Sequence, residues 1–81
     1  MKRFQIYVTG KPGIFDPAGK AAQNALGNLG YAGLESLRIG KFIELTTTDD
    51  VSLAAVEEMC QRLLANPVIE NFRIAELGAG D

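Results

Sequence analysis

Leu37-Arg38-Ile39-Gly40-Lys41-Phe42-Ile43-Glu44-Leu45 is the stretch of this sequence that decides the fold. Its apolar residues recur with a period of two, which predicts a half-buried β-strand. The same alternation also falls on Lys41, directly after Gly40. A flat, uninterrupted strand would carry that ammonium into the core, at a cost of several kcal/mol unless it were paired. We therefore expect the chain to turn, bulge or leave the sheet at Gly40-Lys41.

Two arrangements of residues 34–48 satisfy this pattern. If Gly40-Lys41-Phe42 is a three-residue hairpin loop, the apolar residues on its two sides share one face, giving a ferredoxin-like βαββαβ domain. Otherwise residues 34–48 form one long strand bent at Gly40-Lys41, whose halves serve different sheets. In that case a second subunit completes one of the sheets, as in a domain-swapped dimer.

The flanking sequence predicts a strand and a helix before this stretch and a helix and a strand after it. Residues 2–9 alternate as a strand, and residues 68–77 form the last one. Between them, the first helix starts at an aspartate followed by proline and ends before a glycine suited to a left-handed C-cap. The second starts near Asp49-Asp50 and stops at proline. The residues predicted to form these caps and turns are Asp16, Pro17, Gly19, Gly30, Asn66 and Pro67.

The order β-α-β(β)-α-β predicts an α+β fold related to the ferredoxin-like fold. We expect an antiparallel sheet with both helices on one face, and a middle region 34–48 that is bent or hairpinned at Gly40-Lys41. Residues 1–77 should form a single domain, and residues 78–81 a disordered tail. The apolar face of the second helix is predicted to consist of Leu53, Val56, Cys60, Leu63 and Leu64.

Composition limits the functions open to the chain. A domain of 81 residues has a marginal core, for which assembly is a common remedy. The formal net charge of −2 gives no bulk attraction to nucleic acid or to a membrane surface. One cysteine fits a reducing compartment, and no run is long enough to span a membrane, so we expect a cytoplasmic protein.

Catalytic chemistry is poorly supplied. The sequence has no histidine, the commonest general base and metal ligand. Cys60 lies on the predicted apolar face, where a buried structural thiol is expected. We predict no catalytic, cofactor-binding or metal-binding residue. Arg38 and Lys41, beside the break at Gly40, either line a solvated edge or present donors to a partner or an anionic group.

Three segments resemble the PurS family, the small subunit of phosphoribosylformylglycinamidine synthase, in a match that runs from about residue 2 to residue 76. They are Asp16-Pro17-x-Gly19, then Arg38-Ile39-Gly40-Lys41 with Glu44-Leu45, and Met59-Cys60-x-x-Leu63-Leu64-Ala65-Asn66-Pro67-Val68-Ile69-Glu70. The chain departs from the family at Ala18, where glutamine is frequent, and at Phe15, where leucine is usual.

The resemblance implies a non-catalytic subunit of purine biosynthesis. The complex converts formylglycinamide ribonucleotide to formylglycinamidine ribonucleotide with ATP, Mg and glutamine. The small subunit would bridge the PurL synthetase and the PurQ glutaminase, and could assist ammonia transfer between them. It would form a dimer or a dimer of dimers and bind no cofactor itself, with Arg38, Gly40 and Lys41 as partner contacts. The alternative is a small ferredoxin-like regulatory module that binds an amino acid or nucleotide at a dimer interface.

Overall fold

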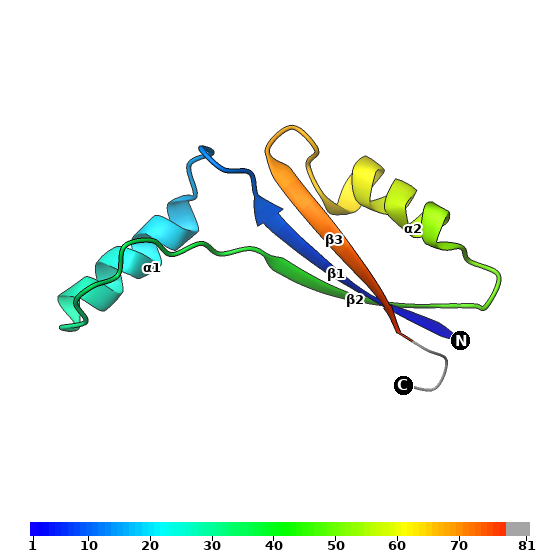
Figure 1. The fold of residues 1–81 in the computed structure, drawn as a ribbon, viewed down its shortest axis with the longest axis horizontal. Helices are drawn as coiled ribbons and strands as arrows, with labels where there is room; N and C mark the ends of the chain where they lie inside the picture. Colours follow the sequence, from blue (N-terminus) through cyan, green and yellow to red (C-terminus); the bar gives the residue numbers. More distant parts are fainter. Residues whose placement is uncertain (78–81) are drawn as a thin grey trace.

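The computed structural model describes residues 1–77 as an antiparallel sheet, one helical layer and a projecting arm (Figure 1). The predicted disordered tail, residues 78–81, lies outside the described residues. The sheet has the order β2-β1-β3, with β1 in the centre. The elements are β1 (Lys2–Gly10), α1 (Pro17–Asn28), β2 (Lys41–Thr47), α2 (Leu53–Met59), the π-helical turn η1 (Cys60–Leu64) and β3 (Glu70–Leu77). The α+β class and the order β-α-β-α-β are therefore confirmed.

The core lies between the sheet and the helical layer of α2 and η1. Phe4, Ile6 and Val8 of β1 alternate with partly exposed residues and are fully buried. They pack with Val56 and Cys60, also fully buried. Strand register follows the apolar pattern, since Ile6 pairs with Ile43 of β2 and with Ile74 of β3. The prediction that Cys60 is a buried thiol is confirmed.

The second helix differs from the prediction at both ends. Its N-cap is Ser52, whose hydroxyl accepts a hydrogen bond from the Ala55 N–H at 3.1 Å, and not Asp49-Asp50. At the other end the Ala65 N–H donates to the Cys60 carbonyl, which closes a π turn instead of an α turn. This wider turn changes the angular step per residue. As a result Leu63, predicted on the buried face, is 83% exposed.

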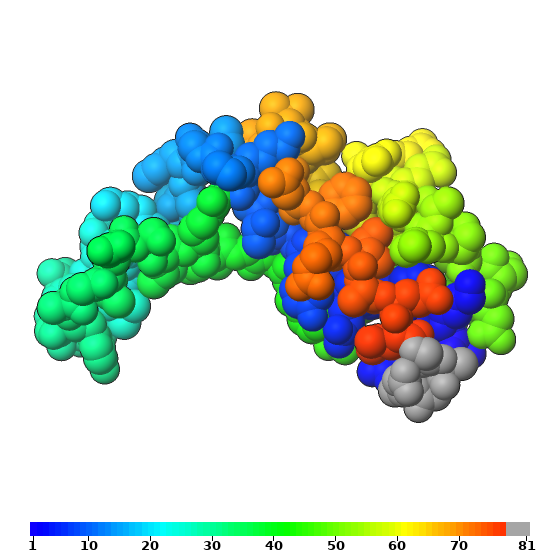
Figure 2. All heavy atoms as spheres, viewed as in Figure 1, coloured from blue at the N-terminus to red at the C-terminus, as the bar shows by residue number. Residues whose placement is uncertain are grey.

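The expectation that both helices cover one sheet face is wrong within the chain. Only α2 and η1 lie on the sheet, whereas α1 lies beyond its end, alongside residues 31–40 (Figure 1). We call residues 14–39 the arm; Figure 2 shows it projecting from the body of the molecule. The Cα radius of gyration is 16.1 Å, against about 12 Å for a compact domain of this length. The reason is that α1 packs on residues 34–39, which do not join the sheet.

The middle region settles the hairpin alternative. Residues 31–40 carry no helix or strand, and β2 begins at Lys41, where it pairs with Val8. The chain runs from residues 34–40 into β2 without reversing, so the three-residue hairpin is wrong (Figure 1). The predicted break at Gly40-Lys41 is confirmed. A Cβ on Gly40 would clash with the Val8 carbonyl, so the chain can leave the sheet this closely only with glycine there. No helix within residues 1–77 is long and apolar enough to cross a membrane.

Candidate assembly site

A single carboxylate joins the start of α1 to the segment before β2. Asp16 is the N-cap, and one of its oxygens accepts a hydrogen bond from the Gly19 N–H at 2.9 Å. The other oxygen accepts from the Ile39 N–H, also at 2.9 Å. These two hydrogen bonds lower the pKa of Asp16, with that from Gly19 contributing most. Asp16 therefore ties together two segments far apart in the sequence.

Gly19 makes this close approach possible. It is the buried residue of α1. A Cβ at this position would meet the Leu37 carbonyl oxygen at 2.6 Å and would clash with the Asp16 carboxylate. Because any larger residue would push residues 37–39 away from α1, glycine is required here by space and not by a left-handed backbone.

Arg38 links the arm to the end of β1. Its guanidinium donates to the carbonyl of Gly10 and, at 3.0 Å, to that of Lys11. We call Gly10, Asp16, Gly19, Arg38 and Gly40 the joint. The joint holds the arm at a defined angle to the sheet. The structure thus brings together three of the predicted cap and contact residues, and gives Arg38 an internal partner.

Lys41 is held by a different group. It stands opposite Val8, on the core side of the sheet, but at the exposed start of the edge strand β2. Its ammonium donates to the Leu64 carbonyl at 3.0 Å. That carbonyl lies at the C-terminal end of η1, where cations are favourable. The ammonium is therefore paired and remains in contact with water.

The other predicted cap residues lie away from the joint. Gly30 ends α1 at the tip of the arm with a φ of 101°, and the Tyr31 N–H donates to the Leu26 carbonyl at 3.1 Å, as in a Schellman motif. Asn66 forms the turn before β3, where its side-chain oxygen accepts from the Val68 N–H at 3.1 Å. Both residues shape the chain locally.

The arm carries apolar surface that nothing in residues 1–77 covers. Leu29 is 74% exposed at its tip and Tyr31 is 62% exposed. Along α1 a stripe of small apolar residues at helical spacing is also exposed, beside the face that packs on residues 34–39. We call this set the arm stripe; it consists of Ala18, Ala21, Ala25 and Leu29.

A matching apolar groove lies beside α2. It is lined by Leu45 of β2 and by residues of α2 and η1, with the exposed ion pair between Glu58 and Arg62, at 3.2 Å, on its rim. Its apolar lining consists of Leu45, Ala55, Met59, Leu63 and Leu64. Within the described residues, β2 pairs with β1 alone, so its outer edge is free. The sequence analysis missed this groove because the π turn exposes Leu63.

Reactive groups are not arranged as a catalytic centre in the part of the chain that the structure describes. Residues 1–77 hold no cluster of three or more side chains able to bind a metal ion. Burial raises the pKa of the Cys60 thiol, which favours the unreactive protonated form. The joint, the arm stripe and the groove instead combine ordered backbone with uncovered apolar surface. Such an arrangement can bind another protein chain.

Comparisons with known proteins agree with this description. Residues 3–77 match the model of the family PurS: Phosphoribosylformylglycinamidine (FGAM) synthase. The subunit PurS of that synthase from Synechocystis sp. is 49% identical over 71 residues, covering 84% of this chain and 71% of the relative.

Solved structures share the fold as well as the sequence. PurS of Bacillus subtilis superposes with a TM-score of 0.87 at 41% identity, covering 96% of this chain and 100% of that one. A chain in the structure of PurLQS from Thermotoga maritima superposes with a TM-score of 0.76 at 30% identity, covering 94% of this chain and 96% of that one. The segments that carry the sequence resemblance lie within the matched region.

Proposed function

The chain belongs to the PurS family of subunits of phosphoribosylformylglycinamidine synthase, and we propose that it acts there as a dimeric, non-catalytic bridge between the PurL and PurQ subunits. Residues 1–77 serve as one domain in this role, in the cytoplasm. ATP and Mg act in the complex and bind to its other subunits. The family match favours this role over that of a regulatory module for small molecules.

The observation that carries the dimer is an excess of surface. The chain exposes 5748 Å², whereas a compact monomer of 8.7 kDa exposes about 4,700 Å². The excess is roughly 1,000 Å² for each chain, or roughly 2,000 Å² for a pair, which is the size of a stable protein interface. Two copies that covered their extra surface on each other would reach ordinary compactness.

The arm and the groove supply complementary parts of that interface. A complete ferredoxin-like domain has four strands and two helices on one face. This chain lacks a strand at the outer edge of β2 and a helix beside α2. We infer that residues 34–39 of each protomer pair with β2 of its partner, and that the arm stripe packs into the partner's groove. The exchange is reciprocal, as a two-fold dimer requires.

The predicted contact residues Arg38, Gly40 and Lys41 then act at the base of the exchanged arm. Arg38 fixes its direction by binding the carbonyls of Gly10 and Lys11. Lys41 holds the end of η1, and with it the groove wall, on β2. Their contribution to partner binding is the positioning of surfaces that the partner touches.

Reconstitution with purified PurL and PurQ tests the function. With glutamine as nitrogen donor, synthesis of the amidine should require this chain. With an ammonium salt as donor, PurL should work without it, which controls for the intactness of PurL. Equal glutamine-dependent rates with and without the chain would refute the bridging role. Analytical ultracentrifugation of the chain alone tests the dimer, and a monomer at micromolar concentration would contradict arm exchange.

A further inference from the structure

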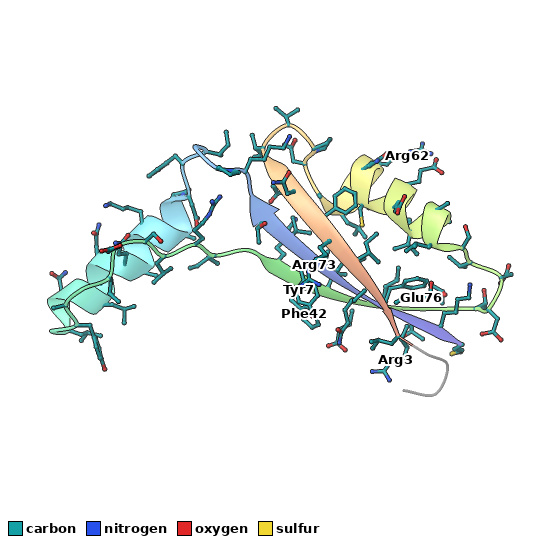
Figure 3. All side chains as sticks on the ribbon, viewed as in Figure 1. Arg3, Tyr7, Phe42, Arg62, Arg73 and Glu76 are labelled. Carbon is teal, nitrogen blue, oxygen red and sulfur yellow. The ribbon has the colours of Figure 1, made fainter. Side chains whose placement is uncertain are left out.

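The sheet face opposite α2 carries an ordered aromatic and cationic centre. The register places Tyr7 of β1 between Phe42 of β2 and Arg73 of β3. The two rings have centroids 5.1 Å apart, and the Arg73 guanidinium lies 4.3 Å from the centroid of Tyr7 (Figure 3). The Tyr7 hydroxyl also donates to the Gln5 side chain at 3.2 Å. These contacts hold the side chains in place before any partner binds.

Nothing in residues 1–77 covers this surface, which we call the open face. Phe42 is 51% exposed although it lies in the middle row of the sheet. The helical layer packs on the other face, where the even-numbered residues of β1 are buried. Arm exchange also uses that other face and the edge of β2. The open face therefore remains available in the dimer.

Its composition is that of a protein-binding surface. Tyrosine and arginine are over-represented among the residues that dominate binding energy, particularly when an apolar centre is ringed by polar groups. Here Gln5, Glu44 and Arg3 continue the face beyond the aromatic centre. With Arg73, the face carries two arginines against one glutamate, although the whole chain has a net charge of −2. Its charge favours an acidic partner.

A second copy of this chain fits the open face poorly. If two open faces stacked about an axis parallel to the strands and over β1, Arg3 would lie over its own symmetry equivalent. If the axis crossed the strands at the row of Gln5, Glu44 would lie over its equivalent, because Gln5 and Glu44 are paired. Like charges directly opposed at an interface are unfavourable. The face is suited to a different protein.

We propose that the open face docks a non-identical subunit of the synthase through an apolar contact on Tyr7 and Phe42, flanked by carboxylates that pair with Arg73 and Arg3. This inference rests on the proposed function, since it assigns the surface by which the dimer meets the rest of the complex. The centre needs little ordering on binding, because Arg73 is already held against Tyr7.

Two variants test the proposal. Phe42→Ser removes an exposed aromatic ring, and Arg73→Glu reverses the charge at the edge strand. Lys20→Glu is the matched control, because it makes the same charge reversal at an exposed position on α1, on the side away from the arm stripe. Binding of each dimer to immobilised PurL and to immobilised PurQ is measured separately, with circular dichroism and ultracentrifugation as checks on fold and dimer.

Each test variant should remain a folded dimer and bind at least one of the two subunits about tenfold more weakly, or worse, as expected for loss of a dominant contact. Lys20→Glu should bind as the unaltered chain does. Unchanged binding of both test variants to both subunits overturns the docking surface while leaving the bridging role intact. Dissociation of the dimer in either variant also overturns it, since the face would then be a contact between copies. Failure of the unaltered chain to bind either subunit refutes the bridging role itself.

Discussion

Substituting the two glycines of α1 separates the joint from the intrinsic preference of the helix. Gly27 has open space around it, so Gly27→Ala should gain the helix-propensity difference of about 0.5–1 kcal/mol. Gly19→Ala has the same intrinsic gain, but its Cβ would meet the Leu37 carbonyl oxygen at 2.6 Å. Overpacking of this kind costs about 1–3 kcal/mol. The net change for Gly19→Ala is then a loss of up to about 2 kcal/mol, opposite in sign to that for Gly27→Ala.

Urea denaturation at one fixed protomer concentration measures both changes, since the stability of a dimer depends on concentration. At the midpoint of thermal unfolding, each 1 kcal/mol corresponds to about 4–8 °C for a domain of this size. Gly19→Ala should also weaken dimerisation, because it displaces residues 37–39 and the arm with them. If Gly19→Ala were as stable as Gly27→Ala, the close contact between α1 and residues 37–39 would not exist in solution.

Three further predictions concern the arm, the groove and the joint. Leu63→Asp should convert the dimer to a monomer of unchanged secondary structure in ultracentrifugation and circular dichroism, because Leu63 is exposed in the isolated chain and covered on arm exchange; a stable dimer would contradict it. Lys41→Glu should fold but assemble more weakly with PurL and PurQ, since it breaks the bond to the Leu64 carbonyl; unimpaired assembly would tell against a role there. Because the pKa of Asp16 is lowered in the folded chain, its contribution to stability is present above about pH 3.8 and is lost as pH falls through the lowered pKa, so Asp16→Asn should flatten acid unfolding curves in this range.

Local signals in the sequence were sufficient for most elements. Alternation fixed β1 and its buried face, and the pairing of aspartate with proline placed the start of α1 at Asp16-Pro17. The phase error at Lys41 correctly located the break in the middle region. Each of these depends on a few neighbouring residues, which is why the sequence alone could show them.

Features that depend on distant contacts were missed. The position of α1 is set by Asp16 binding the Ile39 N–H and by Arg38 binding the end of β1, which are contacts across more than twenty residues. The π turn at Cys60–Leu64 rotates Leu63 out of the buried face, and helical periodicity assumes a constant step. Neither the arm nor the groove could therefore be placed from periodicity.

Two of the segments that carry the family resemblance are the two sides of one joint. Asp16-Pro17-x-Gly19 supplies the carboxylate and the space, and Arg38-Ile39-Gly40-Lys41 supplies the N–H, the guanidinium and the close approach to β1. An arm held this way at its base is ordered before it meets a second protomer. Association then loses less conformational entropy than it would with a flexible arm, and more of the energy of apolar burial remains for binding. The break at Gly40-Lys41 thus directs the arm outward at a fixed angle, and the contacts that fix that angle lie within a single chain.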